Sequence, residues 1–181
     1  MNGQAAYLAA PIFNDQQLKV VEAIKTALEV RQFEVFSPYH ESRAIWKGRA
    51  PKDCTPEERA QVLRGNIQHL SCKLVVAWVG GYEQGFTDPG VVWEMGYAGA
   101  LSGTPAAFDS LPNYPVVLAY IHDTDYRQAM NLMLAGTVDA VAKGHRELSD
   151  ALDMAAKREY TLMASQFHPD HHLATDKEPI V

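Results

Sequence analysis

Two carboxylates, Asp88 and Glu94, are the strongest candidates for chemistry in this 181-residue sequence. They lie six residues apart in the segment Asp88-Pro-Gly-Val-Val-Trp-Glu94-Met-Gly-Tyr-Ala, across the start of a predicted helix. The apolar run 74–79 just upstream is typical of a buried strand. A strand, a glycine-containing loop and a helix that carries an acid together form a common small-molecule site in α/β domains. Glu94 also stands among apolar and aromatic residues, where acids are rare unless they are paired or functional.

This pair of acids suits the chemistry of a sugar carbon. An ionised, partly desolvated carboxylate is a competent nucleophile toward an electron-poor anomeric carbon, and the amino end of a helix favours the ionised form. The second acid can then donate a proton or hold a sugar hydroxyl. In the alternative interpretation Asp88 caps the helix and Glu94 forms a surface ion pair.

Tyr7 and Asn131 are further candidates. Tyr7 ends the first predicted strand, where its phenol could orient a nucleophile by a hydrogen bond, or it is a core tyrosine. Asn131 sits in an apolar segment, where its amide must find partners, so it is either a ligand contact or a satisfied structural amide. Four side chains in one long loop could contact a base or a phosphate, or face solvent: Arg43, Trp46, Lys47 and Arg49.

Several kinds of site have no support in the sequence. It contains neither a Gly-x-Gly-x-x-Gly motif nor a Walker-type loop, which argues against dinucleotide or triphosphate binding by those devices. Cys54 and Cys72 lack metal-ligand spacing and are expected to be reduced thiols. His168, His171 and His172 belong to a polar tail that we expect to be solvated. The sequence thus offers no recognisable dinucleotide-binding or metal-ligand motif.

The overall composition restricts the possible partners. The chain has 16 basic and 22 acidic residues, a net charge of −6 and 47% hydrophobic residues. This balance argues against a nucleic-acid polymer as partner, and the apolar runs are too short to span a bilayer. The first residues lack a basic region typical of a secretory signal, so we expect a cytoplasmic protein.

The apolar patterns predict alternating strands and helices. Strands are expected at residues 5–10, 33–36, 74–79, 115–121 and 138–142. Helices are expected at about 15–29, 55–70, 91–101, 127–135 and 147–163, with long loops at 37–55 and 103–114. This alternation predicts an α/β fold with a doubly wound, five-stranded parallel sheet, a flavodoxin-like or Rossmann-like three-layer sandwich.

Residues 1–165 would form this single domain, and 166–181 a polar, mobile tail. Ligands bind beyond the carboxyl ends of the strands in such folds. The segments 7–13, 37–55 and 80–90 and the residues after Ile121 are therefore expected to converge there.

In four places the sequence resembles the nucleoside 2-deoxyribosyltransferases. The matching segments, in order, are Tyr7–Asp15, Asn66-Ile-Gln, Asp88–Ala98 and Asn131-Leu-Met133. The resemblance covers roughly residues 5 to 160. It implies that Glu94 attacks the anomeric carbon to form a deoxyribosyl-enzyme, that Tyr7 positions Glu94 and that Asp88 binds sugar hydroxyls. A second base would then take the sugar with net retention, and no cofactor is needed.

The resemblance also implies the remaining substrate contacts. Phe13, Gly90 and Met133 would bind substrate, and Asn131 would reach the site of an adjacent protomer, so a homo-oligomer with shared sites is expected. Lys73 stands where many family members carry an acid near the departing base. It could contact an acceptor atom on the base or a phosphate.

Three functions follow from these residues. The leading one is transfer of 2-deoxyribose between bases of 2′-deoxynucleosides, in nucleotide salvage. The second is an N-glycosidase that uses water as acceptor, acting on nucleosides or on 5′-monophosphates whose phosphate would meet Lys73, Arg43 or Arg49. The third is a non-catalytic nucleotide-binding module on the same fold.

Overall fold

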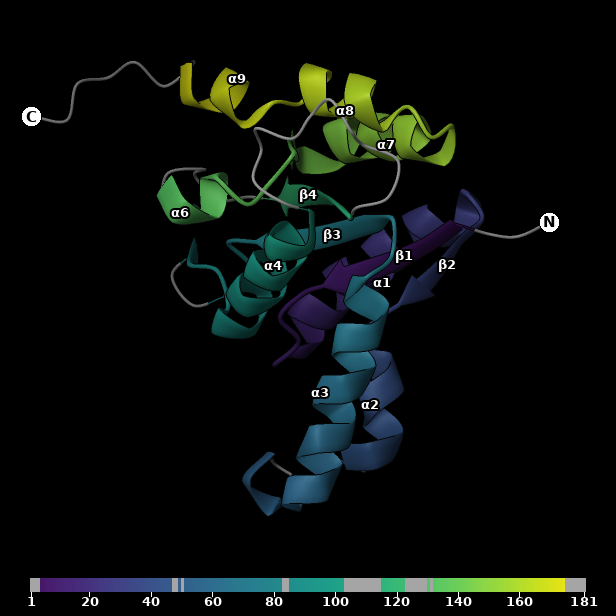
Figure 1. Ribbon diagram of the computed structural model, residues 1–181, viewed down its shortest axis with the longest axis vertical. Coiled ribbons are helices and arrows are strands. Elements are labelled where there is room, and N and C mark those ends of the chain that lie inside the picture. Colours follow the sequence, from purple (N-terminus) through teal and green to yellow (C-terminus); the bar gives the residue numbers. More distant parts are fainter. Residues whose placement is uncertain are drawn as a thin grey trace, which may run out of the picture.

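The computed structural model describes residues 4–46, 49, 51–82, 85–102, 115–122, 130 and 132–174. Its centre is a five-stranded parallel sheet with the order β2-β1-β3-β4-β5 (Figure 1). The strands are β1 (Gln4–Ala9), β2 (Phe33–Phe36), β3 (Leu74–Val79), β4 (Val116–Ile121) and β5 (Ala140–Lys143). The winding direction reverses between β1 and β3, which is the arrangement of a doubly wound sheet. The predicted fold is confirmed.

Helices cover both faces of this sheet, so each face is apolar. Every residue of β3 and β4 is buried, as expected for central parallel strands. One face packs against α1 (Asp15–Val30), α7 (Gly144–Ala156) and α8 (Tyr160–Gln166). The other packs against α3 (Pro56–Leu70), α4 (Pro89–Ser102) and α6 (Leu132–Ala135). Tyr7 of β1 points to the side of α3 and α4.

Two predicted helix starts are confirmed by their caps. The side chain of Asn14 accepts a hydrogen bond from the Gln17 backbone N–H at the start of α1. Thr55 and Glu58 form a reciprocal capping box at the start of α3. These local bonds satisfy backbone donors that a helix start leaves open.

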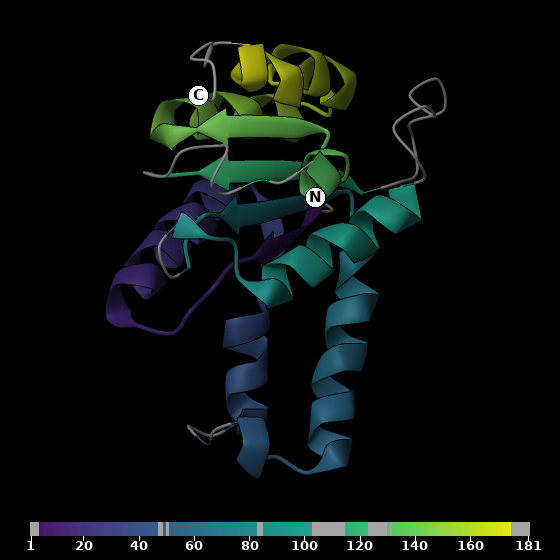
Figure 2. The same cartoon turned by 90° about the vertical axis from the view of Figure 1, so that its left-hand side faces the viewer.

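The expected loop at 37–55 is wrong. It contains the helix α2 (Pro38–Trp46) and the short 3₁₀ turn η1 (Pro51–Asp53). Ser37 and Pro38 start α2 much as Thr55 and Pro56 start α3, since Ser37 O accepts from Glu41 N and Pro38 occupies the first turn. Helices α2 and α3 stand side by side and project together away from the sheet (Figure 2).

The single helix expected at 147–163 is also wrong, because the chain breaks between α7 and α8. Arg158 adopts a left-handed φ of 64°, a conformation that ends a helix. The chain then forms α8 and, after it, α9 (Pro169–Ala174). Phe167 is buried, and its carbonyl accepts from Val141 N at 2.7 Å, which ties this segment to β5. The domain boundary at residue 165 stays a prediction.

Some predictions fall on residues that the structure does not describe. The expected loop 103–114, most of the first half of the helix expected at 127–135 and the end of the tail lie outside the described ranges. Among the helices that are described, none has the length and apolar character needed to cross a membrane.

Candidate active site

A hydrogen bond between β1 and α4 forms the centre of the site. The Tyr7 hydroxyl donates to Glu94 Oε1 at 2.6 Å. Tyr7 is fully buried and Glu94 is only 8% exposed. Tyr7 lies inside β1, between Phe36 and Val75 of the neighbouring strands, and not at the end of the strand as predicted. It reaches Glu94 because its side chain points out of the sheet toward α4.

Burial dominates the electrostatics of this pair. Burial, and to a lesser degree the charge of Asp88, raise the pKa of Glu94 to about 7, while the hydrogen bond from Tyr7 lowers it. Burial and the nearby Glu94 charge raise the pKa of Tyr7 far above its ordinary value. Tyr7 therefore stays a phenol and donates, so near neutral pH Glu94 can be a carboxylate without competing for the proton.

Asp88 caps the helix that carries Glu94. Its Oδ2 accepts from Gly90 N at 2.8 Å and from Val91 N at 3.2 Å. The structure thus contains the helix cap by Asp88. Glu94, in contrast, is buried, and it forms no surface ion pair with the residues that the structure describes. A Cβ on Gly90 would lie 2.8 Å from Asp88 Oδ2, so a side chain there would displace the capping carboxylate.

A cavity of about 330 Å³ opens beside Glu94, and we refer to it as the Glu94 cavity. Its volume is within the range of small-molecule sites. Residues from α2, α3, α4 and the turn before α3 line it: Ile45, Cys54, Glu58, Arg59, Val62, Leu63, Asn66, Gly90, Trp93 and Glu94. The predicted segments 37–55 and 80–90 thus contribute to the cavity, while the segment 7–13 does not line it.

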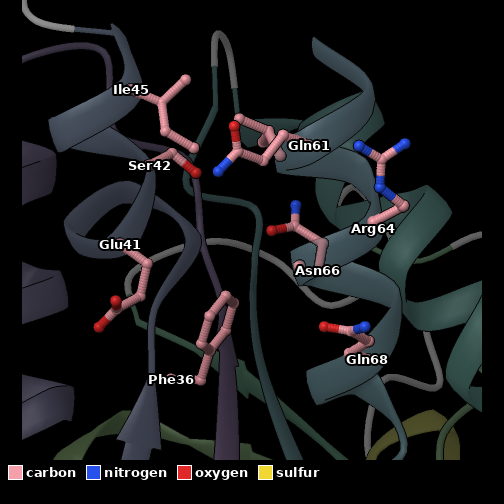
Figure 3. A pocket seen from close by; sticks show the side chains of 10 residues that line it. Phe36, Glu41, Ser42, Ile45, Gln61, Arg64, Asn66 and Gln68 are labelled. Carbon is pink, nitrogen blue, oxygen red and sulfur yellow. The ribbon is translucent and has the colours of Figure 1, made fainter. Parts of the chain in front are cut away.

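A second cavity of about 300 Å³ lies between α2 and α3 (Figure 3). Gln61 and Asn66 point from α3 toward the facing Ser42 and Phe36 (Figure 3). Asn66 lines both cavities, and its Oδ1 is buried with no hydrogen-bond partner in the described part of the chain. A buried unpaired carbonyl is costly, so a ligand that donates to it would be favoured.

Asn66 was not predicted as a site residue. The sequence placed it only within a matching helical segment. Its spacing from Val62 and Leu63, four and three residues earlier, is the signal that puts it on the cavity face of α3.

Aromatic stacking holds the Tyr7 ring. Its centroid lies 5.4 Å from that of Phe36, and Phe36 stacks on His69 at 3.8 Å. His69 Nδ1 forms a hydrogen bond with the Gly65 carbonyl at 2.8 Å. This row of rings fixes the direction in which the phenol points.

The other predicted substrate contacts lie away from the Glu94 cavity or outside the residues that the structure describes. Phe13, four residues beyond the end of β1, is 67% exposed and meets Tyr82 edge to face. Lys73 immediately precedes β3, at the amino end of the strand, and does not line the cavity. Met133 belongs to α6 by its backbone, and Asn131 lies outside the described residues.

The basic residues of the 37–55 segment have other partners. Arg43 lies over the ring of Tyr39 at 5.9 Å. Arg49 pairs with Glu58 at 2.6 Å. Lys47 and the side chain of Trp46 lie outside the described part of the chain. The basic residue that does line the Glu94 cavity is Arg59, which sequence reasoning missed.

The cysteines and histidines do not form a metal site in the described ranges. No group of three or more His, Cys, Asp or Glu side chains there could hold a metal ion. Cys54 is buried, and burial raises the pKa of the Cys72 thiol to about 11, so that this thiol stays protonated. His168 and His171 contact each other at 6.1 Å between ring centroids.

Fold and site together define an α/β protein with a small-molecule site centred on one buried carboxylate. The chain belongs to the nucleoside 2-deoxyribosyltransferase family, whose family model matches residues 6–142. The resemblance predicted from the sequence is confirmed. The family acts on nucleosides and nucleobases, so this chain is a nucleoside-handling enzyme.

Two solved structures share the fold. The 2-deoxyribosyltransferase of Bacillus psychrosaccharolyticus aligns with a TM-score of 0.61 at 21% identity, over 81% of this chain and 90% of that one. A conserved protein of Enterococcus faecalis V583 aligns with a TM-score of 0.60 at 16% identity, over 85% and 99% of the two chains. The CMP N-glycosidase of Clostridium botulinum aligns with a lower TM-score of 0.49 at 16% identity, over 84% of this chain and 99% of that one. Among curated proteins no sequence matches the chain.

Proposed function

We propose that the protein transfers 2-deoxyribose between nucleobases of 2′-deoxynucleosides through a glycosyl ester on Glu94. The observation that carries this proposal is the buried Glu94 carboxyl at the cavity wall, held by the Tyr7 phenol at 2.6 Å. A nucleophilic carboxylate must be desolvated, aimed and ionised near neutral pH, and this environment favours all three.

The reaction has two displacements at C1′. The Glu94 carboxylate attacks C1′, the bond from C1′ to the base nitrogen breaks, and the electron pair leaves with the base, which takes up a proton. A second base then attacks C1′ from the face opposite the ester, the ester bond breaks and frees the carboxylate, and the incoming base loses its N–H proton. Two inversions give net retention. The absent 2′-hydroxyl favours the reaction, because an electron-withdrawing group there would destabilise an oxocarbenium-like transition state.

The remaining residues have supporting roles in this proposal. Tyr7 positions Glu94, and Asp88 holds the start of α4 and binds a sugar hydroxyl. Phe13, Gly90, Lys73, Met133 and Asn131 are proposed substrate contacts, with Asn131 acting in the site of a neighbouring copy. The enzyme would thus be a cytoplasmic homo-oligomer that serves nucleotide salvage.

A product assay tests the proposal. A 2′-deoxynucleoside is incubated with the enzyme, with and without a different free base, and the products are separated by chromatography. We expect the new deoxynucleoside to form only when the acceptor base is present, and Glu94→Ala to abolish it. Release of free deoxyribose at a rate independent of added base would establish an N-glycosidase instead, and binding without turnover a non-catalytic module.

A further inference from the structure

Arg59 and Glu94 line different parts of the same cavity. On α3 the cavity residues Arg59, Val62, Leu63 and Asn66 follow the spacing of one helix face. Arg59 and Asn66 are seven residues apart, which corresponds to about 10 Å along the helix axis. Helix α4 crosses the end of α3 that is nearer the sheet (Figure 2). Arg59, in the first turns of α3, thus lies toward the projecting end, away from the sheet.

Between these two ends the cavity walls are mainly apolar. Ile45, Cys54, Val62 and Leu63 belong to the lining, and Trp93 contributes an aromatic face from α4. Glu58 also lines the cavity, where its carboxylate pairs with Arg49. Apolar and aromatic walls suit the flat ring of a nucleobase, whereas a phosphate would lose hydration there without gaining partners. A sugar at Glu94 would therefore place its base between these walls, with the outer edge of the base toward Arg59.

Arg59 is an exposed residue whose guanidinium forms one hydrogen bond to the backbone and still has donors to offer. Its Nη1 donates to the Cys54 carbonyl at 2.9 Å. In the part of the chain that the structure describes, the Arg59 side chain forms this one hydrogen bond, so its other N–H groups can turn to a ligand. Arginine donates hydrogen bonds and accepts none. It therefore favours a base edge made of acceptors and disfavours an amino group at the same place.

We propose that Arg59 makes this enzyme prefer bases with a carbonyl at the outer edge over bases with an amino group there. The preferred bases are 6-oxopurines and 4-oxopyrimidines, and the disfavoured ones are adenine and cytosine. This inference rests on the proposed function for the placement of the sugar. The buried Asn66 Oδ1, which favours a donor on the ligand, lies seven residues from Arg59 on α3 and therefore at the other end of the cavity.

Base binding and turnover together test this inference. Saturation-transfer NMR titrations give the Kd of free hypoxanthine, adenine, uracil and cytosine, and kcat/KM is measured for 2′-deoxyinosine and 2′-deoxyadenosine. We expect a preference for the oxo base of about tenfold or more, the size of a specific arginine contact to a base edge. Arg59→Gln should reduce it to about twofold, and Arg59→Lys, which keeps the charge but not the planar fork, should reduce it partly.

Arg64→Gln is the matched control, since Arg64 lies on the same helix but lines the second cavity. It should keep the full preference. Equal binding of hypoxanthine and adenine by the wild type, or an unchanged preference in Arg59→Gln, would overturn the inference.

A comparison of 2′-deoxyinosine with its 5′-monophosphate separates a base contact from a phosphate contact. Arg59→Gln should leave the ratio of their kcat/KM values unchanged, and a large loss for the monophosphate alone would contradict the inference. If the free bases bind with the expected preference but no nucleoside is cleaved, the proposed function fails while the role of Arg59 stands.

Discussion

The Tyr7 hydroxyl and Glu94 Oε1 are 2.6 Å apart although 87 positions separate the residues in the sequence. This bond joins the interior of β1 to the second turn of α4. It is also the interaction that lowers the pKa of Glu94 against the opposing effects of burial and of Asp88. The ionisation of Glu94 therefore depends on this contact, and several variants can test that dependence.

The rate of base release should rise with pH. Glu94 attacks only as a carboxylate, and its pKa is raised to about 7, so kcat/KM should fall as pH drops through 7 and level off above it. Tyr7→Phe removes the donor that favours the charged form and should move the midpoint upward by about one unit. The measurement is a pH profile of kcat/KM for both proteins. A midpoint that moves downward in Tyr7→Phe would be inconsistent with a donating phenol.

Replacing Glu94 by Gln should stabilise the protein at alkaline pH. In the unfolded chain the carboxyl ionises near its ordinary pKa of 4.5, and in the folded chain at about 7. Folding therefore becomes less favourable as pH rises from 4.5 to 7. Above pH 7 the whole free-energy cost of burying the ionised carboxylate is present. At about 1.4 kcal/mol per unit this cost is about 3 kcal/mol. Gln has no charge, still accepts from Tyr7 and removes the cost.

Urea unfolding of the wild type and Glu94→Gln at pH 5 and pH 8 measures this effect. The difference in unfolding free energy should be small at pH 5 and approach the full value at pH 8. Glu34→Gln, on an exposed position of β2, controls for loss of one negative charge. If Glu94→Gln raised the unfolding free energy by the same amount at pH 5 and pH 8, the charge of Glu94 would not be what destabilises the folded protein.

Asp88 should have two separable effects. Asp88→Asn keeps an acceptor for the Gly90 and Val91 N–H groups, so stability should change little, but it removes the charge that raises the pKa of Glu94. The midpoint of the pH profile should therefore fall. Asp88→Ala loses the cap as well and should cost about 1 kcal/mol of stability. Thermal unfolding together with the pH profile distinguishes these effects, and identical behaviour of the two variants would refute the separation.

Two glycines of α4 should respond in opposite directions to alanine. A Cβ at Gly90 meets Asp88 Oδ2 at 2.8 Å, so Gly90→Ala must displace the capping carboxylate. A Cβ at Gly96 meets nothing within 4 Å, so Gly96→Ala should stabilise the helix by up to about 1 kcal/mol. Calorimetric melting of both variants checks the sign. Stabilisation by Gly90→Ala as large as that by Gly96→Ala would show that the cap is unimportant.

The sequence predicts the sheet well because central parallel strands are nearly continuous apolar runs. The runs at β3 and β4 and the caps at Asn14 and Thr55 are strong local signals, and the structure contains them. The polar composition of the segment 37–55 predicts a loop. Helix α2 nevertheless forms there, packed on α3, and the Ser37-Pro38 start was the signal available.

Within the site, the spacing of Asp88 and Glu94 in the sequence predicts that they lie near one another. It does not predict the contacts that set their chemistry. The cap of Asp88, the burial of Glu94 and the bond from Tyr7 depend on how α4 lies on the sheet. Arg59 and Asn66 could not be chosen from the sequence for the same reason. Their common cavity exists only because α2 and α3 project together beside α4.

The most direct test of the central claim is to trap the sugar on the enzyme. A 2-deoxy-2-fluoro nucleoside with a good leaving base slows both displacements, because fluorine destabilises an oxocarbenium-like transition state, so a glycosyl-enzyme accumulates. Intact-protein mass spectrometry followed by peptide mapping should find one fluorosugar, attached to Glu94 and absent from Glu94→Gln. Turnover of the natural substrate without any adduct, or an adduct on another residue, would contradict the account.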